Sequence, residues 1–252
     1  MKFFDANILY GVPSQKRMYE PVPDCASLLL KMKEFGIERA VVHREEQFFN
    51  SPITANALLA DDVAGTDDLW GIWTMLPPHC GEMPAPENIL SEMKKKRIVG
   101  WQFFPAQNKY IFHRRVLKQW FELAEKNNIP LYIDFAFVSE KDLFDVMDEY
   151  QGLTVILRNA GVWPPDRILR PFLAEFPNAY MELSFYLVPD GIENLVSDGF
   201  AERILFSTRF QMSHAGGPMM MVKHAAISEN EKSLIASGNL ERILERIDYD
   251  NL

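Results

Sequence analysis

The 252-residue sequence lacks several features that mark particular classes of protein. Its two cysteines, Cys25 and Cys80, form neither a disulfide framework nor a Cys-x-x-Cys motif, so we expect a reducing cytoplasm as its compartment. No G-x-G-x-x-G or phosphate-binding loop follows any apolar run, and the nucleotide-binding fingerprint is therefore missing. The five histidines include no H-x-H or H-x-x-x-H pair, which argues against a zinc site built from neighbouring histidines.

Positive charge and long apolar runs are also scarce. The chain has 26 Lys and Arg against 35 Asp and Glu, a formal net charge of -9, so we expect neither nucleic acid nor an anionic membrane surface as a partner. Asp5 interrupts the first apolar residues too early for a signal peptide. No apolar run approaches the roughly 20 residues that a transmembrane helix needs.

What the sequence does contain is a regular alternation of two patterns. Eight short apolar runs are typical of strands buried on both faces, and they cover residues 3–11, 37–43, 69–76, 98–104, 129–137, 154–159, 179–185 and 203–210. Helical spacing, capping residues and glycine or proline stops predict helices between them, at 24–36, 55–63, 86–96, 113–127, from 139, 164–176, 191–197, 219–226, 228–236 and 239–247. Segments 11–23 and 44–52 are predicted as loops.

This alternation predicts an α/β fold. A length near the usual ~250 residues, with no internal linker, favours a single-domain (β/α)8 TIM barrel over residues 1–252. A doubly wound open sheet is the alternative, although it lacks its nucleotide-binding motif.

Polar residues recur in or at the ends of the predicted strands. In a barrel they would converge at one end, and they are Asp5, Asn7, His43, Gln102, Asp134, Asn159, Glu182 and Arg209. Buried charges need partners, so one interpretation is a plug in which Arg209, with Arg158, neutralises the carboxylates. The other is a ligand site built from the same residues, since barrel mouths usually carry function.

Several segments resemble the motifs of a known family. Asp5–Gly11 is similar to the opening pattern D-x-H-x-H-x-G, and Gly36–Val42 to G-I-x-x-A-V-V. Val155–Gly161 resembles V-I-L-x-H-x-G, Arg203–Phe210 resembles R-I-L-F-G-T-D-F, and Gly238–Leu244 resembles G-N-x-x-R-I-L. In these motifs the chain resembles the amidohydrolase superfamily, in particular its amidohydrolase-related branch. The resemblance spans nearly the whole chain and implies a TIM-barrel, metal-dependent hydrolase.

The chain departs from these patterns where the family binds metal. Asn7 and Leu9 stand in place of the first histidine pair, Asp134 and Asn159 in place of two later histidines, and Arg209 in place of an aspartate. Zn²⁺ needs three or four His, Cys or carboxylate ligands, and an arginine that stays protonated repels a divalent cation. We therefore expect a divergent member with no metal site and no cofactor.

Three functional hypotheses follow. The first is a barrel that binds a small anionic molecule, carboxylate or phosphate, through Arg209, with little or no hydrolytic activity. Asp5, Asn7, Gln102, Asn159 and Glu182 would complete the ligand site.

The second hypothesis is an active metal-independent hydrolase, lactonase or lyase, since the superfamily includes members that hydrolyse lactones without metal. Arg209 would hold the substrate, and His43 or Asp134 would act as base. The third is a non-catalytic structural or interaction protein with an ion-pair-plugged mouth. The 12 Met and 18 Phe also leave a homo-oligomer open.

Overall fold

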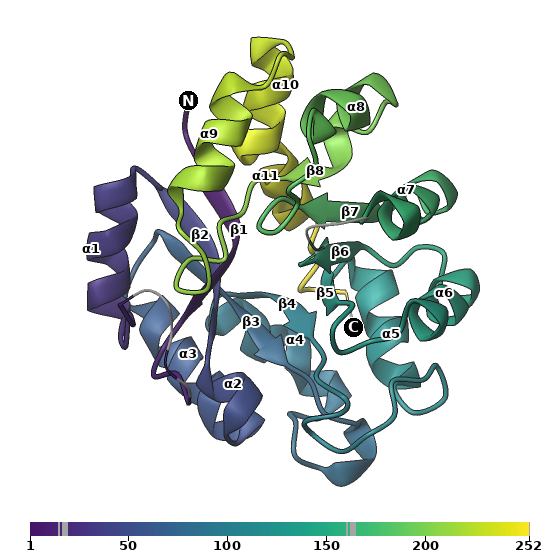
Figure 1. Cartoon of the computed structure of the whole chain (residues 1–252). Helices are drawn as coiled ribbons and strands as arrows, with labels where there is room; N and C mark the ends of the chain where they lie inside the picture. The colour runs from purple at the N-terminus through teal and green to yellow at the C-terminus, as the bar shows by residue number, and fades with distance from the viewer. Residues whose placement is uncertain (15, 17–19, 160, 162–164, 252) are drawn as a thin grey trace.

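A computed structural model describes residues 1–14, 16, 20–159, 161 and 165–251. Eight parallel strands pair in sequence order, β1-β2-β3-β4-β5-β6-β7-β8. Their bounds are β1 Phe4–Tyr10, β2 Arg39–Arg44, β3 Leu69–Thr74, β4 Ile98–Gln102, β5 Leu131–Asp134, β6 Val155–Arg158, β7 Ala179–Glu182 and β8 Ile204–Leu205. The predicted (β/α)8 barrel is confirmed, with the helices outside the ring of strands (Figure 1).

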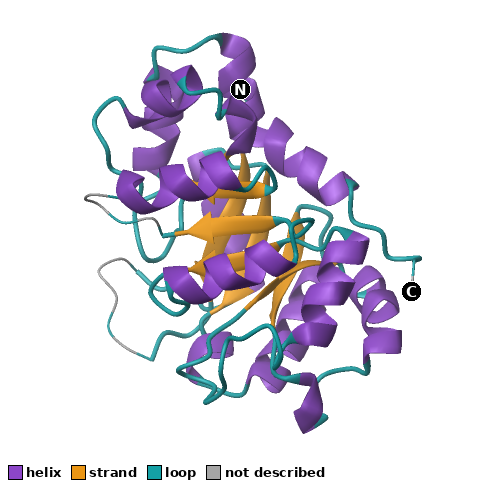
Figure 2. Cartoon of the chain, turned by 90° about the vertical axis from the view of Figure 1, so that its right-hand side faces the viewer, coloured by secondary structure: helices purple, strands orange, loops and turns teal. Residues whose placement is uncertain are grey.

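The helices alternate with the strands and cover the outside of the sheet (Figures 1 and 2). Their bounds are α1 Cys25–Phe35, α2 Glu46–Phe49, α3 Pro52–Ala64, α4 Pro86–Lys95, α5 Lys118–Asn127, α6 Glu140–Glu149, α7 Asp166–Glu175, α8 Gly191–Ser197, α9 Gly216–His224, α10 Glu229–Ser233 and α11 Asn239–Glu245. Short 3-10 helices span Pro78–Cys80 and Ala201–Arg203, and a π-helical turn, Leu234–Gly238, joins α10 to α11.

The ring is closed by contacts between β1 and the chain that follows β8. The backbone N–H of Ala6 donates to the Phe206 carbonyl, and that of Arg209 donates to the Asn7 carbonyl, both at 2.9 Å. The buried Asp5 carboxylate accepts from the backbone N–H and the hydroxyl of Thr208. Arg209 is therefore fixed directly beside the mouth end of β1.

Local signals explain where most elements begin and end. Asp24 caps α1 by accepting from the Ser27 N–H, and Gly36 ends that helix in the left-handed conformation that favours glycine. Ser139 caps α6, and Ser228 with Glu231 forms a capping box at α10. The helix predicted at 164–176 was expected to begin at residue 164, which lies outside the described residues.

Most element boundaries differ by a few residues from the sequence-based expectation, and three of these differences have identifiable local contacts. The predicted loop 44–52 contains the short helix α2, which is held by side-chain hydrogen bonds and not by helix propensity. The helix expected from residue 113 begins at Lys118, because the His113 carbonyl and ring close a separate turn first. The eighth strand is only two residues long; directly after it, Phe206 donates its N–H to the Ile235 carbonyl and accepts from the Ala6 N–H of β1.

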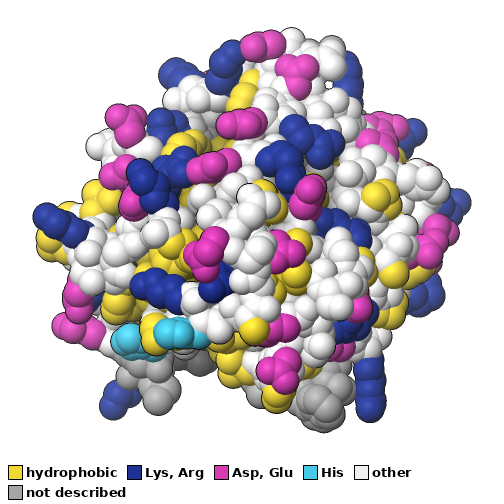
Figure 3. Space-filling model, turned by 90° about the horizontal axis from the view of Figure 1, so that it is seen from above, with side chains coloured by type: hydrophobic (Ala, Val, Ile, Leu, Met, Phe, Trp, Pro, Cys, Tyr) yellow, Lys and Arg dark blue, Asp and Glu magenta, His cyan; other side chains and the backbone are white. Residues whose placement is uncertain are grey.

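Acidic and basic side chains are interspersed over the face shown in Figure 3. Among the described residues, no helix is both long enough and apolar enough to cross a bilayer.

Candidate functional site

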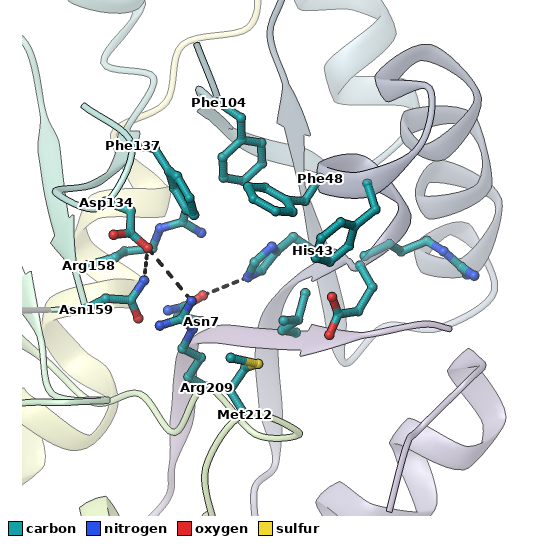
Figure 4. A pocket seen from close by; sticks show the side chains of 14 residues that line it. Asn7, His43, Phe48, Phe104, Asp134, Phe137, Arg158, Asn159, Arg209 and Met212 are labelled. Atoms are coloured by element: carbon teal, nitrogen blue, oxygen red, sulfur yellow. Dashed lines mark hydrogen bonds and ion pairs between the residues drawn. The ribbon is translucent and has the colours of Figure 1, made fainter. Parts of the chain in front are cut away.

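A cavity of about 140 Å³ opens at the mouth of the barrel, beside the strand ends (Figure 4). Its lining divides by chemistry. The polar half consists of Asn7, His43, Asp134, Arg158, Asn159 and Arg209, with Arg44 and Glu45 at the side. The apolar half consists of Leu9, Phe48, Phe49, Phe104, Phe137 and Met212. A volume of this size is close to what a single benzene-sized molecule occupies.

Arg158, the last residue of β6, places a guanidinium at the cavity and is only 2% exposed. Burial lowers the pKa of Arg158 to about 10, so the group stays charged at neutral pH. Among the described residues, its Nε has no hydrogen-bond acceptor. The ring of Tyr132 lies under the guanidinium at 5.8 Å. A desolvated cation with an unused donor makes this part of the cavity strongly attractive to an anion.

Arg209 contributes a second guanidinium, from the loop after β8. Its Nη2 lies 3.9 Å from Asp134 Oδ2, and the ring of Phe185 lies 5.2 Å from its guanidinium carbon. At φ 46° its backbone is in the left-handed region that a non-glycine residue rarely adopts. The hydrogen bond from its N–H to Asn7 and those from Met212 and Ser213 to its carbonyl hold that conformation. Such strain is typical of functional positions.

Asp134 is nearly saturated by donors. It accepts from the backbone N–H of Ala136 at 2.9 Å and from the side-chain amide of Asn159, in addition to its ion pair with Arg209. These interactions fix the orientation of the carboxylate beside Arg209. Because the cavity stays open beside this ion pair, the geometry favours a ligand site over a mouth plugged by its own charges.

His43, on β2, is buried and hydrogen-bonded through Nε2 to Asn7 Oδ1 at 2.9 Å. Burial, followed by the charges of Arg158 and Arg209, holds the pKa of His43 well below its usual value. The ring is therefore neutral at physiological pH. Since Asn7 Oδ1 can only accept, Nε2 carries the proton and Nδ1 keeps a free lone pair. The Asn7 amide nitrogen, also buried, has no acceptor among the described residues.

The apolar half of the cavity is an aromatic wall, which we define as Phe48, Phe104 and Phe137. Their ring centroids are 5.0 Å apart for Phe48 and Phe104, 4.9 Å for Phe48 and Phe137, and 5.2 Å for Phe104 and Phe137. The three rings come from α2 and from the loops after β4 and β5, and Figure 4 shows them on the side of the cavity opposite Arg209. Such rings contact a flat apolar group well.

Three of the sequence-predicted site residues do not line the cavity. Asp5 and Glu182 are fully buried; Asp5 accepts from Thr208 and the Asn7 N–H, and Glu182 from the Asn159 N–H and two serine hydroxyls. Gln102 donates to the Thr74 hydroxyl at 3.0 Å. These residues support the strand ends and the loops that carry the cavity residues. The other five, Asn7, His43, Asp134, Asn159 and Arg209, meet at the cavity.

Sequence reasoning assigned Arg158 only a neutralising role and did not identify the aromatic wall. The sequence did contain a signal that Arg158 lies at the mouth, because it ends an apolar strand, as Arg209 was expected to do. Phe48, Phe104 and Phe137 had none, because Phe48 lies in a segment predicted as a loop and the other two end predicted strands, where an aromatic residue is typical of the core.

A divalent metal ion does not fit the residues at the mouth. Among the described residues, no group of three or more His, Cys, Asp or Glu side chains could hold a metal ion. Asp134 is the one carboxylate at the matching positions, and the guanidinium of Arg209 lies 3.9 Å from it. A permanent cation at that distance opposes a second positive charge.

Comparison with solved structures gives the same fold at low sequence identity. An uncharacterised TIM-barrel protein from Bordetella bronchiseptica matches with a TM-score of 0.74 and 19% identity, over 98% of this chain and 99% of that one. A probable 2-pyrone-4,6-dicarboxylic acid hydrolase from Acinetobacter baumannii, with citric acid bound, matches at 0.71 and 15% identity, over 97% and 100%. A dihydroxybenzoic acid decarboxylase from Polaromonas sp. JS666, with bound manganese and 2-nitroresorcinol, matches at 0.68 and 17%, over 97% of each chain.

Comparison with curated proteins gives no match. The family model described as amidohydrolase matches residues 20–246, which is most of the chain. The protein is thus a member of the amidohydrolase family whose described residues lack a metal-binding cluster.

Proposed function

We propose that the barrel mouth binds a small planar carboxylate without a metal ion. The carboxylate lies between Arg158 and Arg209, and the flat part of the molecule packs against the aromatic wall. The observation that carries this proposal is Arg158, a buried cation that lines the cavity. A carboxylate in the cavity would pair with this guanidinium and offset the cost of burying its charge.

The shape of the cavity favours a carboxylate over a phosphate. A tetrahedral, doubly charged phosphate would place an oxygen against the three phenylalanine rings, which offer it no donor. A ring-bearing carboxylate matches both halves of the cavity. Two of the three named structures support this choice, since a probable 2-pyrone-4,6-dicarboxylic acid hydrolase and a dihydroxybenzoic acid decarboxylase are both named for ring-bearing carboxylic acids.

Catalysis on such a ligand is a second function, favoured by the neutral His43 at the same cavity. In a metal-independent hydrolase, lactonase or lyase, Arg209 would stabilise an oxyanion and the free Nδ1 of His43 would accept a proton. Asp134 is the weaker base, because its lone pairs are already engaged. Assay of lactones and esters of aromatic acids with wild type, Arg209→Ala and His43→Gln tests this role: activity that survives both substitutions contradicts it.

Calorimetric titration with benzoate tests the binding function. We expect binding to wild type and a loss of affinity of roughly 10- to 100-fold in Arg158→Met, the usual effect of losing a charge-assisted hydrogen bond. Benzyl alcohol, which has the ring without the charge, and inorganic phosphate should both bind more weakly than benzoate. Arg115→Met is the matched control, because Arg115 is exposed outside the barrel.

Two results would contradict the proposal. The first is unchanged benzoate affinity in Arg158→Met, or equal loss in Arg115→Met. The second is a stoichiometric content of zinc or manganese in the purified protein that stays the same in Arg209→Ala. Such a metal ion would place a cation where the proposal requires an anion.

A further inference from the structure

The barrel is split at its mouth between β2 and β3. The ladder between these strands ends at the pair Val42 and Gly71, although both strands continue beyond it. On its other side β2 stays paired with β1 as far as Arg44, and β3 stays paired with β4 as far as Thr74. The two strands therefore diverge toward the mouth, and their facing backbone groups need other partners.

Two side-chain amides fill this gap. Gln47 Oε1 accepts from the Arg44 N–H of β2 at 2.7 Å, and its Nε2 donates to the Ile72 carbonyl of β3 at 2.8 Å. The amide of Gln47 thus replaces a missing rung of the ladder. Asn56 makes a two-way pair with Thr74, accepting from its N–H and donating to its carbonyl, each at 2.9 Å.

The two amides are also bonded to each other, and together they form a continuous unit. Gln47 Nε2 donates to Asn56 Oδ1 at 2.8 Å, and Asn56 is 5% exposed while Gln47 is fully buried. Each amide nitrogen donates and each amide oxygen accepts, so the orientation of both groups is fixed. A satisfied, buried polar network of this kind holds its members in one arrangement. We call this pair of residues the amide clamp.

The amide clamp is directly coupled to the aromatic wall. Gln47 lies in α2, a four-residue helix that also carries Phe48. A helix this short is unstable by itself, because nucleation costs more than one turn returns. The position of α2, and with it the Phe48 ring, therefore depends on tertiary contacts. Glu46 bonds Arg44 and the Val12 N–H, and Gln47 supplies the bond to β3. Figure 1 shows α2 and α3, which carry the two amides, at the same side of the barrel.

We propose that Gln47 and Asn56 are positioning residues that bridge the β2–β3 split and hold Phe48 in the aromatic wall. The inference rests on the proposed function for its effect on ligand binding, while the position of Phe48 is open to test without any ligand. The clamp sets selectivity for a flat ring and leaves attraction of the carboxylate to the arginines.

The ligand test compares benzoate with acetate, which carries the charge without the ring. In wild type we expect benzoate to bind at least ~10-fold tighter than acetate, because the phenyl group of benzoate is buried against aromatic rings. In Gln47→Met, which keeps the volume and removes the amide, this ratio should fall to within about threefold, with acetate affinity nearly unchanged. A merely structural defect would weaken both ligands together. The control is Gln119→Met, at an exposed position of α5.

The ligand-free test uses NMR contacts between the Phe48 and Phe104 rings, whose centroids are 5.0 Å apart. We expect these contacts to weaken in Gln47→Met and to persist in Gln119→Met. Their persistence in Gln47→Met, or an unchanged benzoate-to-acetate ratio, would overturn the proposal. Loss of these contacts in a protein that binds neither ligand would support the clamp and count only against the proposed function.

Should Gln47→Met fail to fold, the wild-type protein decides. The side-chain NH₂ protons of Gln47 and Asn56 should exchange with solvent at least ~100-fold more slowly than those of Gln119, because opening the network requires local unfolding. Exchange as fast as that of Gln119 would show that no clamp exists in solution.

Discussion

At the scale of single residues, the mouth combines a buried charge with backbone strain. Arg158 is charged, buried and incompletely hydrogen-bonded among the described residues. Arg209 and Asn159 both adopt the left-handed backbone conformation, at φ 46° and 54°. Desolvated charge and backbone strain lower stability and persist where function requires them. Both occur at this cavity.

The buried charge of Arg158 should lower the stability of the folded protein. Replacing Arg158 with methionine should leave the free energy of unfolding unchanged or raise it by about 1–3 kcal/mol, because an apolar side chain of similar size avoids the desolvation cost. Urea unfolding, followed by tryptophan fluorescence at pH 7, measures the change. Arg158→Met should thus be at least as stable as wild type while it loses benzoate affinity.

A decrease in the free energy of unfolding would contradict this expectation. If Arg158→Met lowers the free energy of unfolding by more than about 2 kcal/mol, Arg158 is a structural partner of Asp134 and not a ligand-binding group. Arg115→Met again serves as the control, with an expected change within about 0.5 kcal/mol.

At the scale of elements, the seam between β1 and the chain after β8 contains a buried carboxyl group. Asp5 connects β1 to Thr208, just beyond β8, through bonds to the backbone N–H and the hydroxyl. Burial raises the pKa of Asp5 from 3.8 to about 7, despite the lowering effect of these donors. Glu182, on β7, is buried as well, and burial raises its pKa too. The strands that close the barrel therefore carry two acid groups whose pKa values burial raises.

The free energy of unfolding should therefore fall as the pH rises from about 4 to about 7 through the contribution of Asp5. In this window the folded state retains the Asp5 proton and the unfolded state has released it, so rising pH favours unfolding, by at most about 1.4 kcal/mol per pH unit. Below this window both states are protonated, and above it the contribution is constant. Asp5→Asn removes the titration, so urea unfolding at several pH values should show the wild-type stability declining relative to the variant.

Because Glu182 shifts in the same direction, only the difference between wild type and Asp5→Asn isolates Asp5. A difference that is constant from pH 4.5 to 7.5 would mean that Asp5 is ionised throughout. Its three hydrogen-bond donors would then outweigh its burial.

At the scale of the whole molecule, global and local electrostatics oppose each other. The net charge is -9, and acidic and basic side chains are interspersed on the face seen in Figure 3. The distant field therefore repels an anion, whereas Arg158 and Arg209 attract it once it reaches the cavity. The distant field is strongly screened by salt, and the partly buried arginines are screened much less.

The association rate of benzoate should therefore rise with ionic strength. Between about 0.01 and 0.15 M salt the Debye length shrinks from about 30 to 8 Å, so the repulsive field is removed first. Stopped-flow measurement should show a faster association and little change in dissociation. A rate that falls with salt would indicate a locally positive approach path, which the charge distribution does not favour.

The fold was determined by the sequence itself. Eight apolar runs alternating with capped helices specify a (β/α)8 barrel, because strand and helix periodicities and capping residues act locally. The same logic placed Asn7, His43, Asp134, Asn159 and Arg209 at the strand ends, since parallel strands deliver these ends to one edge. The replaced metal-ligand positions could likewise be read directly from the chain.

Only the tertiary structure decided which polar residues face the cavity and what faces them. Asp5 and Glu182 have the same strand-end signal as Asp134, yet their carboxylates turn to nearby hydroxyls and backbone N–H groups. The aromatic wall and the amide clamp join segments from separate loops and helices, whose side-chain directions no periodicity encodes. Pairings of this kind depend on packing between distant segments, and for that reason the sequence alone could not identify them.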